Sequence, residues 1–262
     1  MIFYFSATGN SEYAAKKTAA ALGCGTVSIG EALRENSFSY SLKDSEPLGF
    51  ALPTFAGTLP GAAARFIERL QLSGAPGYVF GILTCGGAAG EEAAALGAAL
   101  RGKGFQLDAA FELVMPDNFI LWSSLPDKAR LEAILDSADR ALDDIIAAVT
   151  RGEKNFSDAG GEPRSPYMPF QRLGAAADES VPAMPSLGEF IVTDACTGCG
   201  ECARLCPMEC IKMSGGKPIR DGECTLCLAC LHRCPAGAVE YGDSTRGKTR
   251  YYNPRLAFIT PS

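Results

Sequence analysis

Residues 2–16 read IFYFSATGNSEYAAK, and this stretch decides the fold of the first half of the chain. Its first four residues are all apolar, which is typical of a short buried strand. Six small or polar residues follow, and a segment of helical composition then runs from Glu12 to Leu22, with Ser11 or Asn10 as the expected N-cap. A strand, a glycine-containing turn and a helix in this order predict the start of an α/β domain.

The same alternation continues as far as residue 151. We expect further strands at 26–29, 49–52, 78–83 and 109–114, and further helices at 62–72, 91–102 and 127–150. Strands that alternate with helices predict a doubly wound parallel sheet, here with five strands. Because the carboxyl ends of parallel strands meet at one edge of the sheet, the loops that follow them are expected to form a ligand site together.

Composition and charge narrow the possible functions. The 262 residues carry a net charge of −6, and an acidic protein is a poor partner for nucleic acid. Apolar stretches fall short of the 18 residues that a membrane span needs, and the first residues lack the basic region of a signal peptide, so we expect a cytoplasmic protein without a membrane anchor. Residues 242–262 carry four Lys or Arg against one Asp; this basic tail is expected either to be solvated or to dock on an acidic surface or a negative cofactor.

Nine of the eleven cysteines lie between residues 196 and 234, mostly within two matching runs. CTGCGECARLCP (196–207) and CTLCLACLHRCP (224–235) both read C-x2-C-x2-C-x3-C-P, with a shift of 28 positions. Three thiolates on one tight loop suit three corners of an iron–sulfur cube, and the fourth cysteine of such a run binds the other cluster. Structural zinc is the alternative, but a zinc site has no use for the third cysteine or for the final Cys-Pro. The repeat therefore favours two iron–sulfur clusters in a reducing compartment.

Residues 188–241 resemble the bacterial two-[4Fe–4S] ferredoxins, with both motifs intact. Short strands expected at 191–192, 211–213, 218–219 and 239–241 fit this small α+β fold. The resemblance implies that one cluster is bound by the first three cysteines of the first run and the last of the second, namely Cys196, Cys199, Cys202 and Cys234. The other cluster is then bound by Cys224, Cys227, Cys230 and Cys206.

Two residues near these runs fall outside the ligand pattern. Cys210 is expected to be a small buried side chain, with a ligand role as the alternative. His232, the only histidine, is expected to be solvated or packed, with tuning of a cluster as the alternative.

The SATGNS loop places hydroxyl and backbone N–H groups at a helix N-terminus, where a phosphate is favoured. It contains no lysine of the G-x-x-x-x-G-K-[ST] type and no G-x-G-x-x-G pattern, so we expect one phosphate monoester bound by neutral donors. The pattern resembles the phosphate loop of the flavodoxins, whose cofactor is FMN. The residues that match it are Ser6, Thr8, Gly9, Asn10 and Ser11.

By the same resemblance, the loops PTFAGTLP (53–60) and TCGGAAG (84–90) flank the isoalloxazine ring of the flavin. The residues expected to line this part of the site are Pro53, Thr54, Phe55, Ala56, Gly57, Thr84, Cys85, Gly86 and Gly87. Phe55 is expected either to lie against the flavin or to anchor its own loop. Asp117, Asn118 and Trp122 follow the last strand at the same edge, with turn formation and packing as their expected roles and contact with the site as the alternative.

Over its whole length the chain resembles the flavodoxin–ferredoxin fusion proteins of anaerobic bacteria and archaea. This organisation implies an FMN-binding domain at 1–151, a Pro-rich linker at 152–187 with enough apolar residues to be ordered, a ferredoxin domain at 188–241 and a basic tail at 242–262. The tail sequence GKTRYYNP (247–254) also resembles the end of that family.

The resemblance implies a protein that transfers electrons between FMN and two [4Fe–4S] clusters. Such a protein connects two-electron and one-electron partners, which are redox proteins or small-molecule donors and acceptors. A flavin-dependent reductase of a small substrate, with the clusters as its electron supply, is the alternative, although no constellation of catalytic side chains is evident near the loops. A binding module with purely structural clusters is a third hypothesis.

Overall fold

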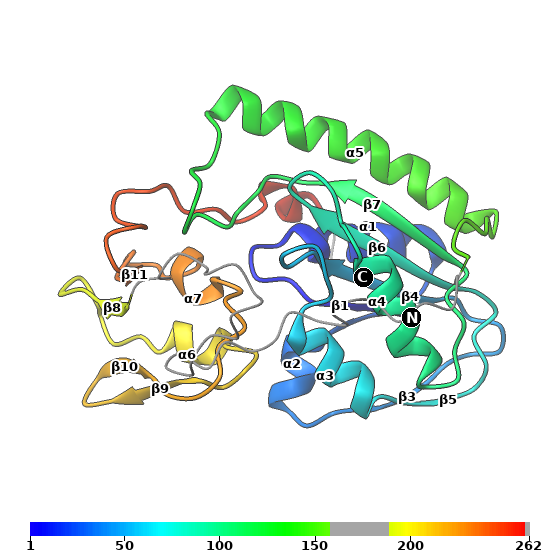
Figure 1. Cartoon of the computed structure of the whole chain (residues 1–262), viewed down its shortest axis with the longest axis horizontal. Helices are drawn as coiled ribbons and strands as arrows, with labels where there is room; N and C mark the ends of the chain where they lie inside the picture. Colours follow the sequence, from blue (N-terminus) through cyan, green and yellow to red (C-terminus); the bar gives the residue numbers. More distant parts are fainter. Residues whose placement is uncertain (158–188, 260–262) are drawn as a thin grey trace, which may run out of the picture.

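The computed structural model describes residues 1–157 and 189–259 (Figure 1). A five-stranded parallel sheet has the order β2-β1-β4-β6-β7. Its strands are β1 (Ile2–Tyr4), β2 (Thr26–Ser28), β4 (Leu48–Pro53), β6 (Val79–Cys85) and β7 (Ala109–Val114). When only these five strands are counted, the order is 2-1-3-4-5, which is the flavodoxin-like order of a doubly wound sheet. The predicted fold of the first domain is therefore confirmed.

Helices cover both faces of the sheet (Figure 1). Helices α1 (Asn10–Leu22) and α5 (Lys128–Thr150) pack on one face, whereas α2 (Ile29–Arg34), α3 (Gly61–Arg69) and α4 (Glu92–Arg101) pack on the other. Successive side chains of a strand point to opposite faces, so Phe50 belongs to the core beneath α3 and Ala51 to the core beneath α1. The central strands are buried on both faces, as their continuous apolar composition predicts.

The structure corrects two details of the expected elements. The helix expected at 62–72 ends at Arg69, and residues Gln71–Ser73 form a short strand, β5, that pairs with β3 (Ser39–Ser41). Helix α2 and strand β3 are absent from the expected elements because segments of three to six residues are too short to show a clear hydrophobic period.

The second domain consists of two antiparallel strand pairs and two short helices. Strand β8 (Phe190–Val192) pairs with β11 (Val239–Tyr241), and β9 (Ile211–Ser214) pairs with β10 (Lys217–Arg220). Helices α6 (Glu201–Leu205) and α7 (Ala229–His232) lie within the cysteine runs. The hydrophobic core of this domain also contains Ile120 and Leu121, which come from the loop after β7, so the two domains share a core.

The chain after α5 continues along the first domain. The side-chain oxygen of Asn155 accepts a hydrogen bond from the Ala110 N–H at 2.9 Å, and Phe156 packs on Gly97 so closely that a Cβ at Gly97 would lie 2.9 Å from its ring. Compact structure therefore extends beyond residue 151. The expected order of the linker concerns mainly residues 158–187, which lie outside the described residues.

The C-terminal tail returns to the first domain and contains a 3-10 helix, η1 (Pro254–Phe258) (red in Figure 1). Arg255 forms ion pairs with three carboxylates of α5, namely Glu132, Asp136 and Asp139. This part of the basic tail docks on an acidic surface, which was one of the two expectations for it.

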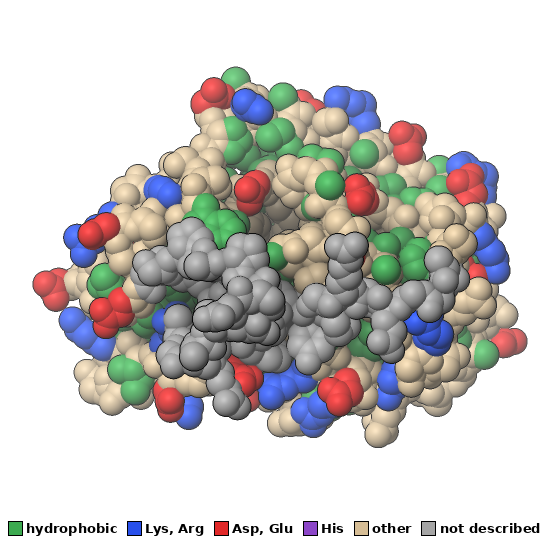
Figure 2. Space-filling model, in the orientation of Figure 1, with side chains coloured by type: hydrophobic (Ala, Val, Ile, Leu, Met, Phe, Trp, Pro, Cys, Tyr) green, Lys and Arg blue, Asp and Glu red, His purple; other side chains and the backbone are tan. Residues whose placement is uncertain are grey.

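Charged residues are mixed on the face shown in Figure 2, where basic and acidic side chains alternate around the outline. In the part of the chain that the structure covers, no helix is both long and apolar enough to span a bilayer.

Candidate cofactor sites

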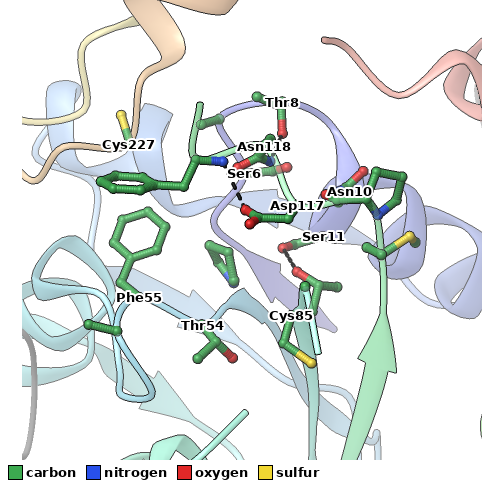
Figure 3. Close-up of a pocket in the computed structure, with 18 of the residues that line it drawn as sticks. Ser6, Thr8, Asn10, Ser11, Thr54, Phe55, Cys85, Asp117, Asn118 and Cys227 are labelled. Atoms are coloured by element: carbon green, nitrogen blue, oxygen red, sulfur yellow. Dashed lines mark hydrogen bonds between the residues drawn. The ribbon is translucent and has the colours of Figure 1, made fainter. Parts of the chain in front are cut away.

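A cavity of about 360 Å³ opens at the carboxyl edge of the sheet (Figure 3). The loops after β1, β4, β6 and β7 line it, together with a short segment of the second cysteine run. Its volume lies in the usual range for small-molecule and cofactor sites. Every residue expected from the sequence to contact a flavin lies on its wall except Gly9.

Gly9 forms the N-terminus of helix α1 and packs away from the cavity. Its φ of 91° lies in the left-handed region, and a Cβ at this position would meet Cδ1 of Leu256 at 2.6 Å. Gly9 is the N-cap and no side chain caps the helix, so the expectation of a Ser11 or Asn10 cap is wrong. Because the first N–H groups of a helix have no intrahelical acceptor, the uncapped first turn leaves backbone donors for an anion at this wall.

The hydroxyl groups of the first loop hold the loop in shape. Ser6 Oγ accepts a hydrogen bond from the Gly9 N–H at 3.0 Å. The Ser11 and Thr84 hydroxyls are 2.7 Å apart, which joins the loop after β1 to the end of β6. Thr8 Oγ1 accepts a hydrogen bond from the side-chain amide of Asn118 (Figure 3). These contacts fix the backbone that would surround a phosphate.

Asn10 is buried, and both its amide nitrogen and its amide oxygen form hydrogen bonds within the protein. Its amide nitrogen donates to the Pro116 carbonyl at 3.2 Å, and its oxygen accepts from the Tyr251 hydroxyl at 2.7 Å and from the Asn253 side chain at 3.1 Å. The side chain is therefore a support for the loop. Asn10 lies on the cavity wall, as the sequence predicts, but the sequence does not predict this supporting role.

The loop after β4 rests on a buried carboxylic acid. The Thr54 hydroxyl donates a hydrogen bond to Oε2 of Glu92, and Oε1 of Glu92 has no hydrogen-bond partner among the described residues. Burial raises the pKa of Glu92 well above its usual range. Sequence reasoning missed this residue because a glutamate in the first turn of a helix is usually exposed.

Aromatic rings form another side of the cavity. Phe55 lines the cavity and also packs against Phe5, with ring centroids 6.2 Å apart, so the anchoring role is seen and contact with a flavin stays a prediction. Phe119 and Trp122 meet edge to face at 4.9 Å on the same wall, and Trp122 is 53% exposed. Phe119 was missed from the sequence, although it lies in the same segment as Trp122.

Packing against a neighbouring loop explains one of the glycines in the loop after β6. A Cβ on Gly86 would lie 2.8 Å from Cβ of Asp117, so glycine is required by this neighbour. Asp117 in turn accepts a hydrogen bond from the Phe119 N–H at 2.9 Å, which is the expected turn-forming role. Cys85 is buried at the cavity wall, and burial raises the pKa of its thiol.

The cysteines of the second domain line two small cavities, and each cavity draws on both runs. The first contains Cys196, Cys199, Cys202 and Cys234. The second contains Cys206, Cys224, Cys227 and Cys230, with Cys210 as a fifth cysteine. In residues 1–157 and 189–259, no three His, Cys, Asp or Glu side chains are arranged to hold a single metal ion. A four-iron cluster does not need such an arrangement, because its cysteine ligands bind different iron atoms.

Polar groups surround the cysteines of the second cavity. The Sγ atoms of Cys206 and Cys210 are 3.5 Å apart, and hydrogen bonding to Cys210 lowers the pKa of Cys206 and of Cys224. The Leu226 N–H lies 3.3 Å from Cys224 Sγ. Hydrogen bonds of this kind favour thiolate sulfur, which is the form that binds iron.

A half-buried arginine, Arg220, favours a negative group at the second cavity. The Arg220 guanidinium lies 5.4 Å from the rings of both Phe190 and Tyr241, and its charge helps to lower the pKa of Cys224. Its Nη1 is buried and has no hydrogen-bond partner within the described parts of the chain. Since a cluster with four thiolate ligands is negative, the second cavity fits the group that its cysteines imply.

The two sites share a wall. Thr225, Leu226 and Cys227 of the second run line the cavity at the sheet edge, and Cys227 also lines the second cysteine cavity. Figure 3 shows Cys227 entering the picture from the second domain, above Phe55. No local sequence pattern predicts that Cys227 lies at both cavities, because this position depends on how the two domains pack together.

Comparisons with known proteins agree with this arrangement. Residues 195–244 match the model of the 4Fe-4S dicluster domain. Over 50 residues the chain is 38% identical to a ferredoxin of Methanothermococcus thermolithotrophicus, and the match spans 83% of that protein and 18% of this chain. Over 44 residues it is 43% identical to an uncharacterized ferredoxin of Methanocaldococcus jannaschii, spanning 71% of that protein and 16% of this chain.

The first domain has a weaker likeness to solved structures. A candidate flavoprotein from Bacteroides uniformis aligns with 53% of this chain and 96% of its own, at 16% identity and a TM-score of 0.32. The flavodoxin-like fold therefore rests on the strand order of the sheet. The chain joins this flavodoxin-like domain to a second domain that belongs to the dicluster ferredoxin family, the iron–sulfur domain of an electron-transfer protein.

Proposed function

We propose that the protein transfers electrons between one FMN, bound at the sheet edge, and two [4Fe–4S] clusters in the second domain. The functional units are residues 1–151 for the flavin, 188–241 for the clusters and 242–262 as a tail that joins them, with 152–187 as the linker. This proposal is supported by the cavity at the carboxyl edge, the cysteine-lined cavities and the family of the second domain.

The phosphate of FMN is assigned to the uncapped N-terminus of α1, within the loop from Ser6 to Ser11. The first-turn N–H groups and the helix dipole favour a phosphate there without any lysine or arginine in the loop. The isoalloxazine ring is assigned to the region between the loops that carry Phe55 and Gly87, with Phe119 and Trp122 nearby. FMN supplies the exchange of either one or two electrons.

The clusters are assigned to the cysteines by the cavities that they line. Cys234 completes the ligand set of the first run, and Cys206 completes that of the second. Cys210 remains a neighbour of the second set, in hydrogen-bond contact with Cys206.

The observation that carries the proposal is the position of Cys227 on the wall of both the flavin cavity and the second cysteine cavity. The cluster held by the second run is then the neighbour of the flavin, and the cluster held by the first run is the outer one. One fully reduced FMN carries two electrons and each cluster accepts one, so a single flavin can supply one electron to each of the two clusters. Cys199 is exposed at the first cavity, which makes this side the exit toward an external redox partner.

The proposed setting is the cytoplasm, where the eleven cysteines remain reduced. The partners are redox proteins or small-molecule donors and acceptors. The alternative of a reductase acting on a small substrate is distinguished by turnover assays, because electron transfer alone consumes no substrate at the flavin.

The test uses the full chain purified without oxygen. We expect one FMN and about eight iron atoms per chain. Photoreduction of the flavin should be followed by EPR signals of reduced clusters, with the signal lost in Cys227→Ser appearing before the signal lost in Cys199→Ser. Stoichiometric flavin without any reducible cluster, or clusters that are reduced only by external reagents, would contradict the proposed transfer.

A further inference from the structure

A continuous chain of buried and half-buried hydrogen bonds joins the phosphate loop to the second cysteine run. It begins at Thr8, whose hydroxyl accepts from the Asn118 side chain. The Asn118 carbonyl oxygen lies 2.8 Å from Nε2 of His232. Nδ1 of His232 lies 3.1 Å from the Tyr251 N–H, and the Tyr251 hydroxyl donates to Asn10 in the same loop where the chain began. Because Thr8 and Asn10 belong to the same loop, these hydrogen bonds and the loop backbone together form a closed ring.

Among the residues of this hydrogen-bond network, His232 is the one that belongs to the ferredoxin domain. It is the last residue of α7, two positions from both Cys230 and Cys234, which line the two different cysteine cavities. Its partners fix one tautomer: a carbonyl oxygen can only accept, so Nε2 carries the proton, and an N–H can only donate, so Nδ1 is unprotonated. His232 is only 6% exposed, and each nitrogen of its imidazole has a hydrogen-bond partner.

We propose that His232 is a positioning residue that couples FMN binding in the first domain to the cysteine-bound cluster site in the second. This inference rests on the proposed function, since it assumes FMN at the 6–11 loop. When α7 is held in place by its cysteines, His232 holds Asn118 and Tyr251, and these two residues hold Thr8 and Asn10. The shape of the phosphate loop is therefore set in part from the ferredoxin domain.

Such a coupling is reciprocal. If the arrangement of α7 favours the binding-competent phosphate loop, then bound FMN favours the same arrangement of α7 by an equal free energy. FMN binding should therefore alter the environment of the cluster next to α7, in addition to any direct electrostatic effect of the flavin.

The experiment divides the two hydrogen bonds of His232 between two variants of the full chain. His232→Gln places an amide near the position of Nε2 and can keep the bond to the Asn118 carbonyl. His232→Asn places an oxygen near the position of Nδ1 and can keep the bond from the Tyr251 N–H. His232→Leu keeps similar volume and neither bond. The measurements are the dissociation constant of FMN, followed by flavin fluorescence, together with iron content and the EPR spectrum of the reduced clusters.

We expect His232→Leu to weaken FMN binding by about tenfold, because the buried Tyr251 N–H loses its acceptor and the Asn118 carbonyl keeps only its bond from the Ile120 N–H. His232→Gln should restore FMN affinity more fully than His232→Asn, because the Asn118 side leads directly to Thr8. Addition of FMN to flavin-depleted protein should change the EPR spectrum of the second-run cluster in the wild type, and this change should be smaller in His232→Leu.

Three outcomes would overturn the coupling. Wild-type FMN affinity in all three variants would show that the histidine does not reach the loop. Equal weakening in His232→Gln and His232→Asn would show that only packing matters, and this comparison still decides the question if His232→Leu fails to fold. An FMN-dependent spectral change of wild-type size in His232→Leu would show that the flavin acts on the cluster directly. By contrast, a wild-type protein that binds no FMN at all would refute the proposed function itself.

Discussion

The Tyr251 hydroxyl donates a hydrogen bond of 2.7 Å to the side-chain oxygen of Asn10, so the end of the chain supports the loop that follows its first strand. Both residues are buried, and Asn253 adds a second bond to the same oxygen and a backbone bond to the Thr8 carbonyl at 2.8 Å. The tail consequently supports the loop that lines the cavity at the sheet edge, and it also connects the two domains.

Tyr251→Phe removes one of these hydrogen bonds and keeps the ring. We expect the dissociation constant of FMN to rise by roughly fivefold with unchanged iron content, because a typical buried hydrogen bond contributes about 1 kcal/mol. The control is Tyr252→Phe, whose hydroxyl makes only a 3.4 Å contact with Glu12 and whose side chain is exposed. Equal FMN affinities in the two variants would mean that the tail does not support the loop.

The interleaved ligand sets predict which cysteine variants resemble each other. Cys234→Ser should perturb the same EPR signal as Cys196→Ser, although the two residues lie in different runs, because both line the first cavity. Cys206→Ser should perturb the other signal, in common with Cys224→Ser. Cys24→Ser, at a cysteine of the first domain, serves as the control and should leave both signals intact. If Cys206→Ser resembles Cys196→Ser instead, each run holds its own metal and the assignment is wrong.

Cys210 gives the second cavity a spare thiol. Its Sγ lies 3.5 Å from that of Cys206, so it can replace Cys206 as a ligand after a small shift of the loop between them. We expect Cys206→Ser to keep most of its iron and the double variant Cys206→Ser, Cys210→Ser to lose about four iron atoms per chain. Iron analysis of anaerobically purified protein measures this difference. The same loss in both variants would show that Cys210 cannot act as a ligand.

Glu92 predicts a dependence of stability on pH. Burial raises its pKa in the folded state, so as the pH rises above the ordinary pKa of a glutamate the unfolded chain gives up a proton that the folded chain retains. The free energy of unfolding therefore falls with rising pH, by up to about 1.4 kcal/mol per pH unit for this group.

Glu92→Gln removes this titration while keeping an amide close in shape to the neutral acid. Anaerobic denaturant unfolding, followed by circular dichroism, should show that the variant gains stability relative to the wild type between pH 5 and pH 8. The neighbouring and exposed Glu91 provides the control variant Glu91→Gln, for which no such gain is expected. A stability difference between Glu92→Gln and wild type that is the same at both pH values would contradict the assignment of a neutral buried acid.

Local patterns in the sequence were sufficient for the main elements. The five strands of the sheet, helix α5 and the four strands of the ferredoxin domain were predicted within one or two residues, because hydrophobic periodicity and turn residues depend on near neighbours. Helix α2 and the β3–β5 pair were missed because elements of three to six residues carry too little pattern. The loop at residues 6–11, which lines part of the cavity at the sheet edge, was predicted for the same local reason, since strand, polar turn and helix are consecutive.

What the sequence determined by itself was the chemistry: a lysine-free polar loop at a helix N-terminus and two matching cysteine runs. Only the tertiary structure decided how these parts meet. It placed Cys227 on the wall of the cavity at the sheet edge, made Asn10 a support for the loop, buried Glu92 and put His232 between the two domains. Each of these facts depends on contacts between residues far apart in the chain, and such contacts are set by the packing of one surface on another, which no local pattern contains.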